Sequence, residues 1–322
     1  MLNALRHALA YVGRHAAASY ALSIVLGLGL PQIAAALRPL IPITIFCFIV
    51  LSFARANLPG LKAVFSDPRK LIGGLLLSAL LPPALGALVL ASPLLEAADP
   101  GVRLAIVLMA SAPALMAAPA FAGVIGLENS FALTALVLGM VVTPLSAPFF
   151  ASLLAGAAVP ISPYALAERL AIFIGGGILL GMGLRKLMGV ERIVALRNEL
   201  DGWGVVLYFL FAIAAMDGVI DMAVTHPAFV IGILALSCGY ALLGFAASYL
   251  ITRSFGFNDR FSMAICIGLR NMGLLIAPIF SVVPQTTFLY FALAQVPIYI
   301  APMVLKALKA KLEPRPAANP ES

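Results

Sequence analysis

Continuous runs of apolar residues alternate with short polar stretches along almost the whole chain. Most runs are ~20 residues long, which is the length that a helix needs to cross the hydrocarbon core of a bilayer. The strands of a membrane barrel would instead show alternating residues in ~10-residue segments. The pattern therefore predicts an all-α polytopic membrane protein. Ten spans are predicted, at about residues 16–31, 39–54, 71–92, 102–124, 130–153, 164–184, 202–217, 226–251, 262–283 and 285–305.

The fourth and ninth predicted spans are both interrupted near their middle. The fourth contains Pro113 and Pro119 among alanines, and the ninth contains Gly268 and Gly273 on either side of two polar residues. Proline removes a helical donor, and glycine permits unwinding. Unpaired backbone groups at membrane depth persist only where they line protein or a wet cavity. Two broken helices that cross indicate a substrate site, whereas a plain proline kink is the alternative for the fourth span alone.

The chain also divides into two halves of five spans each. The fifth span contains Pro144 and Pro148, and the tenth contains Pro297 and Pro302. Because five is odd, the two halves have opposite orientations in the membrane. Such an inverted repeat is common among secondary transporters, and the broken fourth and ninth spans are then equivalent elements of the two halves.

Composition and charge agree with a membrane protein. Apolar residues make up 63% of the chain and charged residues 10%, and the mean hydropathy is +1.09. A soluble domain has about a quarter charged residues. The net charge of +7 does not form a stripe for nucleic acid. The cations occupy alternate loops, which predicts both termini in the cytoplasm of a bacterial-type inner membrane. These loops and the C-terminal region contain Arg55, Lys62, Arg69, Lys70, Arg185, Lys186, Arg192, Arg197, Arg253, Arg260, Lys306, Lys309, Lys311 and Arg315.

Arg270 is the candidate residue for function. It follows Arg260, at the cytoplasmic start of the ninth span, by ten residues, which places it ~15 Å into a core ~30 Å thick. A cation at that depth costs at least about 2.5–3.5 kcal/mol. The predicted spans contain no Asp or Glu at a similar depth, so half-helix ends, carbonyl oxygens or an arriving anion must compensate the charge. Arg270 is then an anchor for an anionic substrate or a structural clamp on backbone carbonyls.

Other residues extend the predicted substrate site. Asn271 offers both donors and acceptors beside Arg270, and Gln295 lies near the middle of the tenth span. Thr143 and Ser146 in the fifth span add polar lining, although single hydroxyls in helices usually bond to their own backbone. No cluster of Asp, Glu or His lies within the spans for catalysis or a metal, so we expect neither an enzyme nor a metal site.

Several of these patches resemble the bile acid:sodium symporter family. The resemblance rests on Gly-Leu-Arg-Asn-Met-Gly-Leu in the ninth span, the Ala-Pro opening of the fourth span, the Thr-Pro of the fifth and the ten-span layout. It implies one transporter unit over residues 1–322, with a panel domain of spans 1, 2, 6 and 7 and a core domain of spans 3–5 and 8–10. It also implies alternating access for organic anions, driven by sodium. Residues 313–322 are predicted to be a proline-rich disordered tail.

The chain departs from this family at its sodium ligands. The family has a Ser-Asn pair in its fourth span, where this chain has Ala118 and Pro119. The family also has a glutamine in its third span, where this chain has Leu77. A Glu and, four residues later, a Gln in the ninth span are matched by Cys266 and Arg270. A guanidinium offers no acceptor and repels sodium.

Sodium coupling is therefore not expected, even though the resemblance implies it. Of the side-chain oxygens that bind sodium in that family, only one has a plausible match in this chain, Thr143. The family's Asn in the ninth span is retained as Asn271. We infer that Arg270 takes the place of the cation, either as its permanent substitute or as an anion anchor. Apart from sodium, no cofactor is expected.

The predicted function is secondary transport of a small organic anion by a monomer or homodimer in the lipid bilayer. The substrate site comprises Arg270, Asn271, Gln295, Ala118, Pro119, Thr143, Gly268 and Gly273. One alternative is an efflux protein of the arsenite or auxin-carrier type, although the fourth span has no thiolate for arsenite. The other is a membrane sensor or scaffold without transport.

Overall fold

The computed structural model describes residues 16–56, 68–128, 130–155 and 162–313. The basic residue Lys62 and the part of the predicted tail from residue 314 onward lie outside these ranges. Within them the regular structure is helical, apart from one isolated antiparallel bridge. The all-α class predicted from the apolar pattern is confirmed.

The helices follow the predicted apolar runs. Eight long helices are α2 (Ala16–Gly29), α4 (Ile41–Ala54), α6 (Pro68–Leu90), α10 (Ser130–Ala155), α11 (Pro163–Met188), α13 (Arg197–Ala215), α15 (Pro227–Ile251) and α18 (Gln285–Leu312). Shorter connecting helices are α3 (Pro31–Leu37), η1 (Arg38–Leu40), α7 (Pro93–Glu96), α12 (Val190–Ala195) and α14 (Val219–Thr225).

Several helices extend beyond the approximate bounds of the predicted spans. α13 starts at Arg197 and its predicted span at about 202, α16 (Phe257–Gly268) starts before its predicted span at about 262, and α18 ends at Leu312 and its predicted span at about 305. The carboxylate of Asp201 pairs with the guanidinium of Arg55, at the end of α4. The side chain of Asp201 is 46% exposed, so its carboxylate lies at the surface of α13 and does not limit the helix.

Two predicted spans are divided into shorter helices. The fourth consists of α8 (Pro100–Ser111) and α9 (Ala118–Val124). The ninth consists of α16 (Phe257–Gly268), α17 (Met272–Ile276) and the 3-10 helix η3 (Ala277–Val282).

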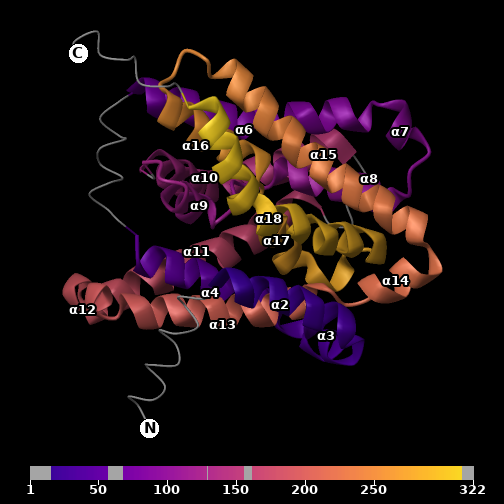
Figure 1. Cartoon of the computed structure of the whole chain (residues 1–322), viewed down its shortest axis with the longest axis horizontal. Coiled ribbons are helices and arrows are strands. Elements are labelled where there is room, and N and C mark those ends of the chain that lie inside the picture. The colour runs from indigo at the N-terminus through magenta and orange to yellow at the C-terminus, as the bar shows by residue number, and fades with distance from the viewer. Residues whose placement is uncertain (1–15, 57–67, 129, 156–161, 314–322) are drawn as a thin grey trace, which may run out of the picture.

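The helices pack in two groups. The panel group is α2, α4, α11 and α13, in the lower half of Figure 1; of these, α11 is nearest the core group and packs on α10 as well as on α4. The core group is α6, α8, α9, α10, α15, α16, α17 and α18, most of which lies above the panel group. Packing in the core group is reciprocal, because α8 packs on α18 and α16 packs on α10. The first half of each broken helix thus contacts the helix that follows the other broken helix in sequence.

Large apolar side chains cover much of the surface. Leu94, Leu187, Met303, Leu145 and Leu179 are all at least 75% exposed. A water-facing surface does not carry apolar residues at this density, whereas a lipid-facing surface requires them. Seven segments in the described ranges are long and apolar enough to cross a membrane: Pro31–Ala54, Leu71–Leu90, Phe131–Leu154, Pro163–Met188, Arg197–Thr225, Pro227–Ile251 and Gln285–Leu312. The chain is a membrane-embedded helical protein.

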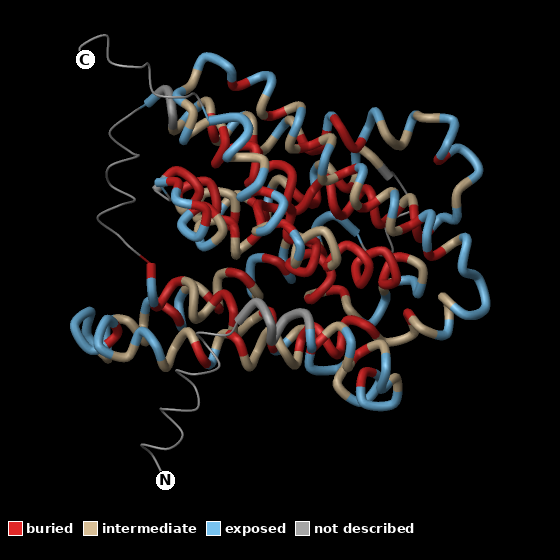
Figure 2. Tube along the Cα trace, viewed as in Figure 1, coloured by how far each residue is buried: buried red, intermediate tan, exposed pale blue. Residues whose placement is uncertain are grey.

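The most buried part of the molecule surrounds the two broken helices. In Figure 2 the buried trace concentrates in the interior of the core group, whereas the outer turns of the long helices are exposed. Residues 262–277, which include the whole break in the ninth span, are all buried. Irregular backbone at this depth needs partners from within the protein.

Candidate functional site

The two helix breaks lie against each other at the centre of the core group. The backbone N–H of Asn271 donates to the carbonyl of Pro113 over 2.9 Å, and the N–H of Leu115 donates to the carbonyl of Leu269 over 2.9 Å. These bonds form an antiparallel bridge around Arg270. Backbone groups released by one break therefore pair with those released by the other, as backbone away from water requires. The prediction that both spans are broken and meet at their breaks is confirmed.

Arg270 lies inside this junction and is 4% exposed. Its Nη2 donates to the carbonyl oxygens of Ala112 and, over 3.3 Å, of Ser78. Its Nη1 donates to the carbonyl of Cys266 over 3.4 Å. Three segments thus supply acceptors to one guanidinium: α6, the break after α8, and α16. The clamp predicted as one role for Arg270 is present.

Helix ends add to this compensation of charge. Both α8 and α16 end at the junction, and the C-terminal end of a helix carries a partial negative charge equivalent to about half an elementary charge. The carbonyls of Ala112 and Cys266 belong to these two ends. The arginine therefore caps two half-helices at once, which offsets part of the cost of burying a cation.

Three buried polar atoms near the junction have no hydrogen-bond partner within the described residues. They are Nε of Arg270, Nδ2 of Asn271 and Oγ of Ser111. All three can donate. Buried donors without partners destabilise a fold by about 1–3 kcal/mol each, so such groups at a helix break indicate a place for a ligand or water.

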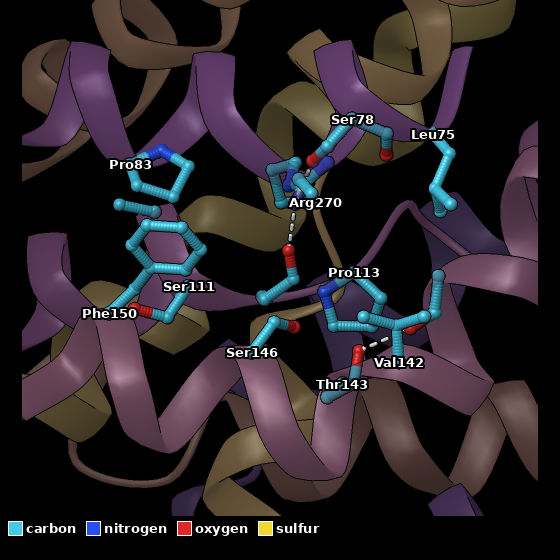
Figure 3. Close-up of a pocket in the computed structure, with 14 residues that line it drawn as sticks. Leu75, Ser78, Pro83, Ser111, Pro113, Val142, Thr143, Ser146, Phe150 and Arg270 are labelled. Atoms are coloured by element: carbon cyan, nitrogen blue, oxygen red, sulfur yellow. Dashed lines mark hydrogen bonds between the residues drawn. The ribbon is translucent and has the colours of Figure 1, made fainter. Parts of the chain in front are cut away.

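A pocket opens beside the junction, between α6, the break after α8, and α10. It is a small, partly open pocket, and the empty space of about 350 Å³ around it includes open solvent. In Figure 3 Ser78 and Arg270 lie on its α6 side, and Thr143 and Ser146 extend from α10 on the other side. The lining residues are Leu75, Ser78, Ala79, Pro83, Ala110, Ser111, Ala112, Pro113, Gly139, Val142, Thr143, Ser146, Phe150 and Arg270.

The predicted polar residues divide between this pocket and its surroundings. Arg270 and Thr143 line the pocket, and the hydroxyl of Thr143 donates to the carbonyl of Gly139 over 2.6 Å. Asn271 lies in the junction, 8% exposed. Gln295 is 7% exposed on α18, and its Nε2 donates to the carbonyl of Phe291 over 3.0 Å.

The predicted glycine, alanine and proline residues lie around the breaks but do not line the pocket. A Cβ at Gly268 would lie 2.8 Å from the carbonyl oxygen of Ala241, so this glycine allows α16 to approach α15. Gly273 faces α4, where a Cβ would lie 3.1 Å from Ile45. Ala118 is fully buried at the start of α9, and Pro119 follows it in the first turn.

Two polar residues of the pocket, Ser111 and Ser78, were not among the predicted site residues. Ser111 ends α8 directly before the Ala-Pro sequence of the break. Its position at a helix end could therefore have identified it from the sequence as a candidate site residue. Ser78 contributes through its carbonyl, which no side-chain pattern reveals; its only signal is that it follows Leu77, a position that the family resemblance marks.

No group of three or more His, Cys, Asp or Glu side chains within the described ranges is placed to hold a metal ion. Cys47, Cys238 and Cys266 are free thiols. In comparisons with known proteins, no family model matches the chain, and no curated sequence is significantly similar to it.

Proposed function

We propose that this protein is a secondary transporter that carries a small organic anion across a bacterial-type inner membrane by alternating access. The observation that supports the proposal is the buried junction of two broken helices around one arginine. Transporter sites are commonly built where discontinuous helices from two halves of the chain meet near the midplane. The resemblance to the bile acid:sodium symporter family, which rests on the motifs quoted above, leads to the same function.

The proposed architecture is ten transmembrane helices in a 5+5 inverted repeat with both termini in the cytoplasm. The reciprocal packing of α8 on α18 and of α16 on α10 supports it, because a two-fold relation between halves produces such pairs. The alternation of basic loops supports the orientation.

The proposed substrate site lies at the junction, on the boundary between the panel and core groups. Both α17 and η3 pack on α4, and η3 also packs on α11. A relative movement of the two groups would therefore expose the junction to one side of the membrane and then to the other. Arg270 and Asn271 supply buried polar groups there, and Gln295 is a further buried polar residue on α18. The substrate is a small carboxylate or related anion, since the site has a cation and, among the described residues, no carboxylate pairs with it.

Binding and transport can be tested separately. Purified protein is first screened by thermal unfolding against anionic metabolites, because a ligand that binds only the native state raises Tm by mass action. A labelled hit is then used for counterflow in proteoliposomes, with protein-free liposomes as the control. We expect a saturable rise in Tm and an overshoot of label.

The outcomes separate the alternatives. A protein that binds an anion but shows no counterflow would support a membrane sensor or scaffold instead. Counterflow without any role for anions, for example of neutral solutes only, would contradict the proposed substrate class.

A further inference from the structure

The pocket between α6 and α10 has the chemistry of an anion site. Its polar side chains are one guanidinium and four hydroxyls, and no Asp or Glu is among the residues that line it. Guanidinium and hydroxyl groups can all donate hydrogen bonds. Of these hydroxyls, that of Thr143 already donates to its own helix, whereas that of Ser111 is buried without a partner in the described structure.

Arg270 retains both charge and donor capacity after its carbonyl contacts are counted. Its Nη atoms bond to three carbonyls, but its Nε has no partner among the described residues. Carbonyl oxygens are dipoles and leave the formal charge of +1 in place. A buried cation is best compensated by an anion that also accepts its remaining hydrogen bond.

The size and walls of the pocket restrict the ligand. Pro83, Val142 and Phe150 form apolar walls, and the empty space is shared with an opening to the surface. A divalent ion would leave an uncompensated negative charge in these surroundings. A single small monovalent group matches one cation and a small number of donors.

We propose that this pocket binds a small monovalent anion, with the charge supplied by Arg270 and a hydrogen bond donated by Ser111. The ligand chemistry is shared by two sources, a halide ion and the carboxylate of the transported solute. The inference rests on the proposed function only for the second source, because a halide can bind whether or not the protein transports anything.

The test measures Tm of the purified full-length protein in detergent at constant sodium concentration and ionic strength. The anion is chloride, formate or the bulkier isethionate. Chloride or formate raises Tm saturably above its value in isethionate. A rise with chloride identifies a halide site, and a rise with formate alone identifies a carboxylate site. Equal Tm values in all three anions would overturn the proposal.

Variants locate the site. In Ser111→Ala, loss of one hydrogen bond to an ion raises the half-saturating concentration roughly 10-fold. Ser237→Ala is the matched control, because Ser237 is also buried but bonds within α15, away from the pocket. Ala79→Leu fills the pocket without removing a polar group and abolishes the anion effect. An unchanged response in both pocket variants would place the anion elsewhere and overturn the proposal.

Counterflow on the same samples keeps the two proposals separate. Transport without an anion-specific Tm shift contradicts only the anion pocket. A shift that depends on Ser111 without counterflow contradicts only the transporter function.

Discussion

Arg270 is a cation buried where water cannot solvate it, and the residues around it show how the fold accommodates this. Its partners are backbone carbonyls from α6, from the end of α8 and from α16. Ser78 is 192 residues away in sequence and Ala112 is 158 residues away. The guanidinium therefore joins three segments that are far apart in sequence, in addition to the backbone bonds between the two breaks.

The Arg270→Gln substitution tests the clamp. Glutamine is shorter and neutral, so it leaves the carbonyls of Ala112 and Ser78 without donors and removes the cation at the two helix ends. We expect a loss of about 3 kcal/mol in the free energy of unfolding, measured as a lower Tm in detergent. Arg270→Lys keeps the charge but not the planar fork, and should lose less. Arg192→Gln, on the exposed helix α12, is the control and should leave Tm unchanged.

The same variants test the anchor. If Arg270 also binds the substrate anion, folded Arg270→Gln should largely lose affinity for an anion found in the Tm screen, and Arg270→Lys should bind it more weakly than wild type. Normal affinity in folded Arg270→Gln would end the anchor hypothesis and move the substrate site toward Asn271 and Gln295.

Sodium dependence is a third test at the scale of single residues. The carbonyls of Ala112, Ser78 and Cys266 are engaged by the guanidinium, and the side chains of Ala118 and Cys266 contain no oxygen. Sodium needs oxygen ligands and is repelled by a fixed cation. Replacement of sodium by potassium at constant ionic strength should leave Tm and uptake unchanged. A saturable effect that is specific to sodium would contradict this view of the site.

The sequence predicts the depth of Arg270 but not its partners. Depth follows from the helical rise and the thickness of the bilayer, both of which are constant. The acceptors are main-chain carbonyls, and every residue has one, so composition cannot distinguish Ser78 from its neighbours. The partner is determined by how α6 packs against the break, which is a property of the tertiary structure.

At the scale of elements, proline alone does not predict a break. Pro144 and Pro148 lie inside the continuous helix α10, and Pro297 and Pro302 lie inside α18. The break in the ninth span has no proline between Gly268 and Asn271. What the two breaks share is a partner: each supplies donors and acceptors to the other. Considering the two interruptions as a pair predicts both breaks. Counting prolines alone would also have predicted breaks in α10 and α18, which are continuous.

Helices α4 and α11 approach each other closely at the glycines of α11. A Cβ at Gly181 would lie 2.6 Å from the carbonyl oxygen of Val50 and 2.8 Å from Cβ of Phe53, both on α4. Gly177 is similarly close to Ile49. Small residues at such contacts let membrane helices approach each other, since apolar burial drives no association in lipid.

The Gly181→Ala substitution should therefore separate α4 from α11. The overpacking should lower stability by about 1–3 kcal/mol, measured by thermal unfolding in detergent. Gly183→Ala is the matched control on the same helix, because a Cβ there meets nothing within 4 Å. This control should be neutral or slightly stabilising, since alanine favours a helix over glycine. Equal effects of the two substitutions would show that α4 and α11 are not in close contact.

At the scale of the whole molecule, the panel and core groups are joined by a polar contact at one end. The guanidinium of Arg38, in η1 of the panel side, donates to Asp217 over 2.7 Å and to Gln285 of α18 over 3.3 Å. It also lies 4.1 Å from the centre of the Phe288 ring. At the opposite end of α4, Arg55 pairs with Asp201 on α13, and Arg185 of α11 donates to the carbonyl of Ala54 over 3.1 Å. Those two contacts lie within the panel group, whereas Arg38 contacts Gln285 of α18, and Arg169 of α11 donates to the carbonyl of Pro278 in η3 over 3.3 Å.

If the proposed transporter works by relative movement of these groups, Arg38 holds the panel group against the core group at the end of the molecule where η1 meets α18. The Arg38→Gln substitution removes the contacts of the guanidinium with Gln285 and with the Phe288 ring, together about 1 kcal/mol for partly exposed groups, which corresponds to roughly a fivefold change in population. Spin labels at Leu40→Cys and Val282→Cys, in a background without native cysteines, report the separation of η1 from η3. We expect Arg38→Gln to add a population at longer distance. Arg197→Gln is the control, because this side chain is 80% exposed and its nearest carboxylate is on its own helix. An unchanged distance distribution in folded Arg38→Gln protein would mean that apolar packing, rather than this contact, keeps that end closed.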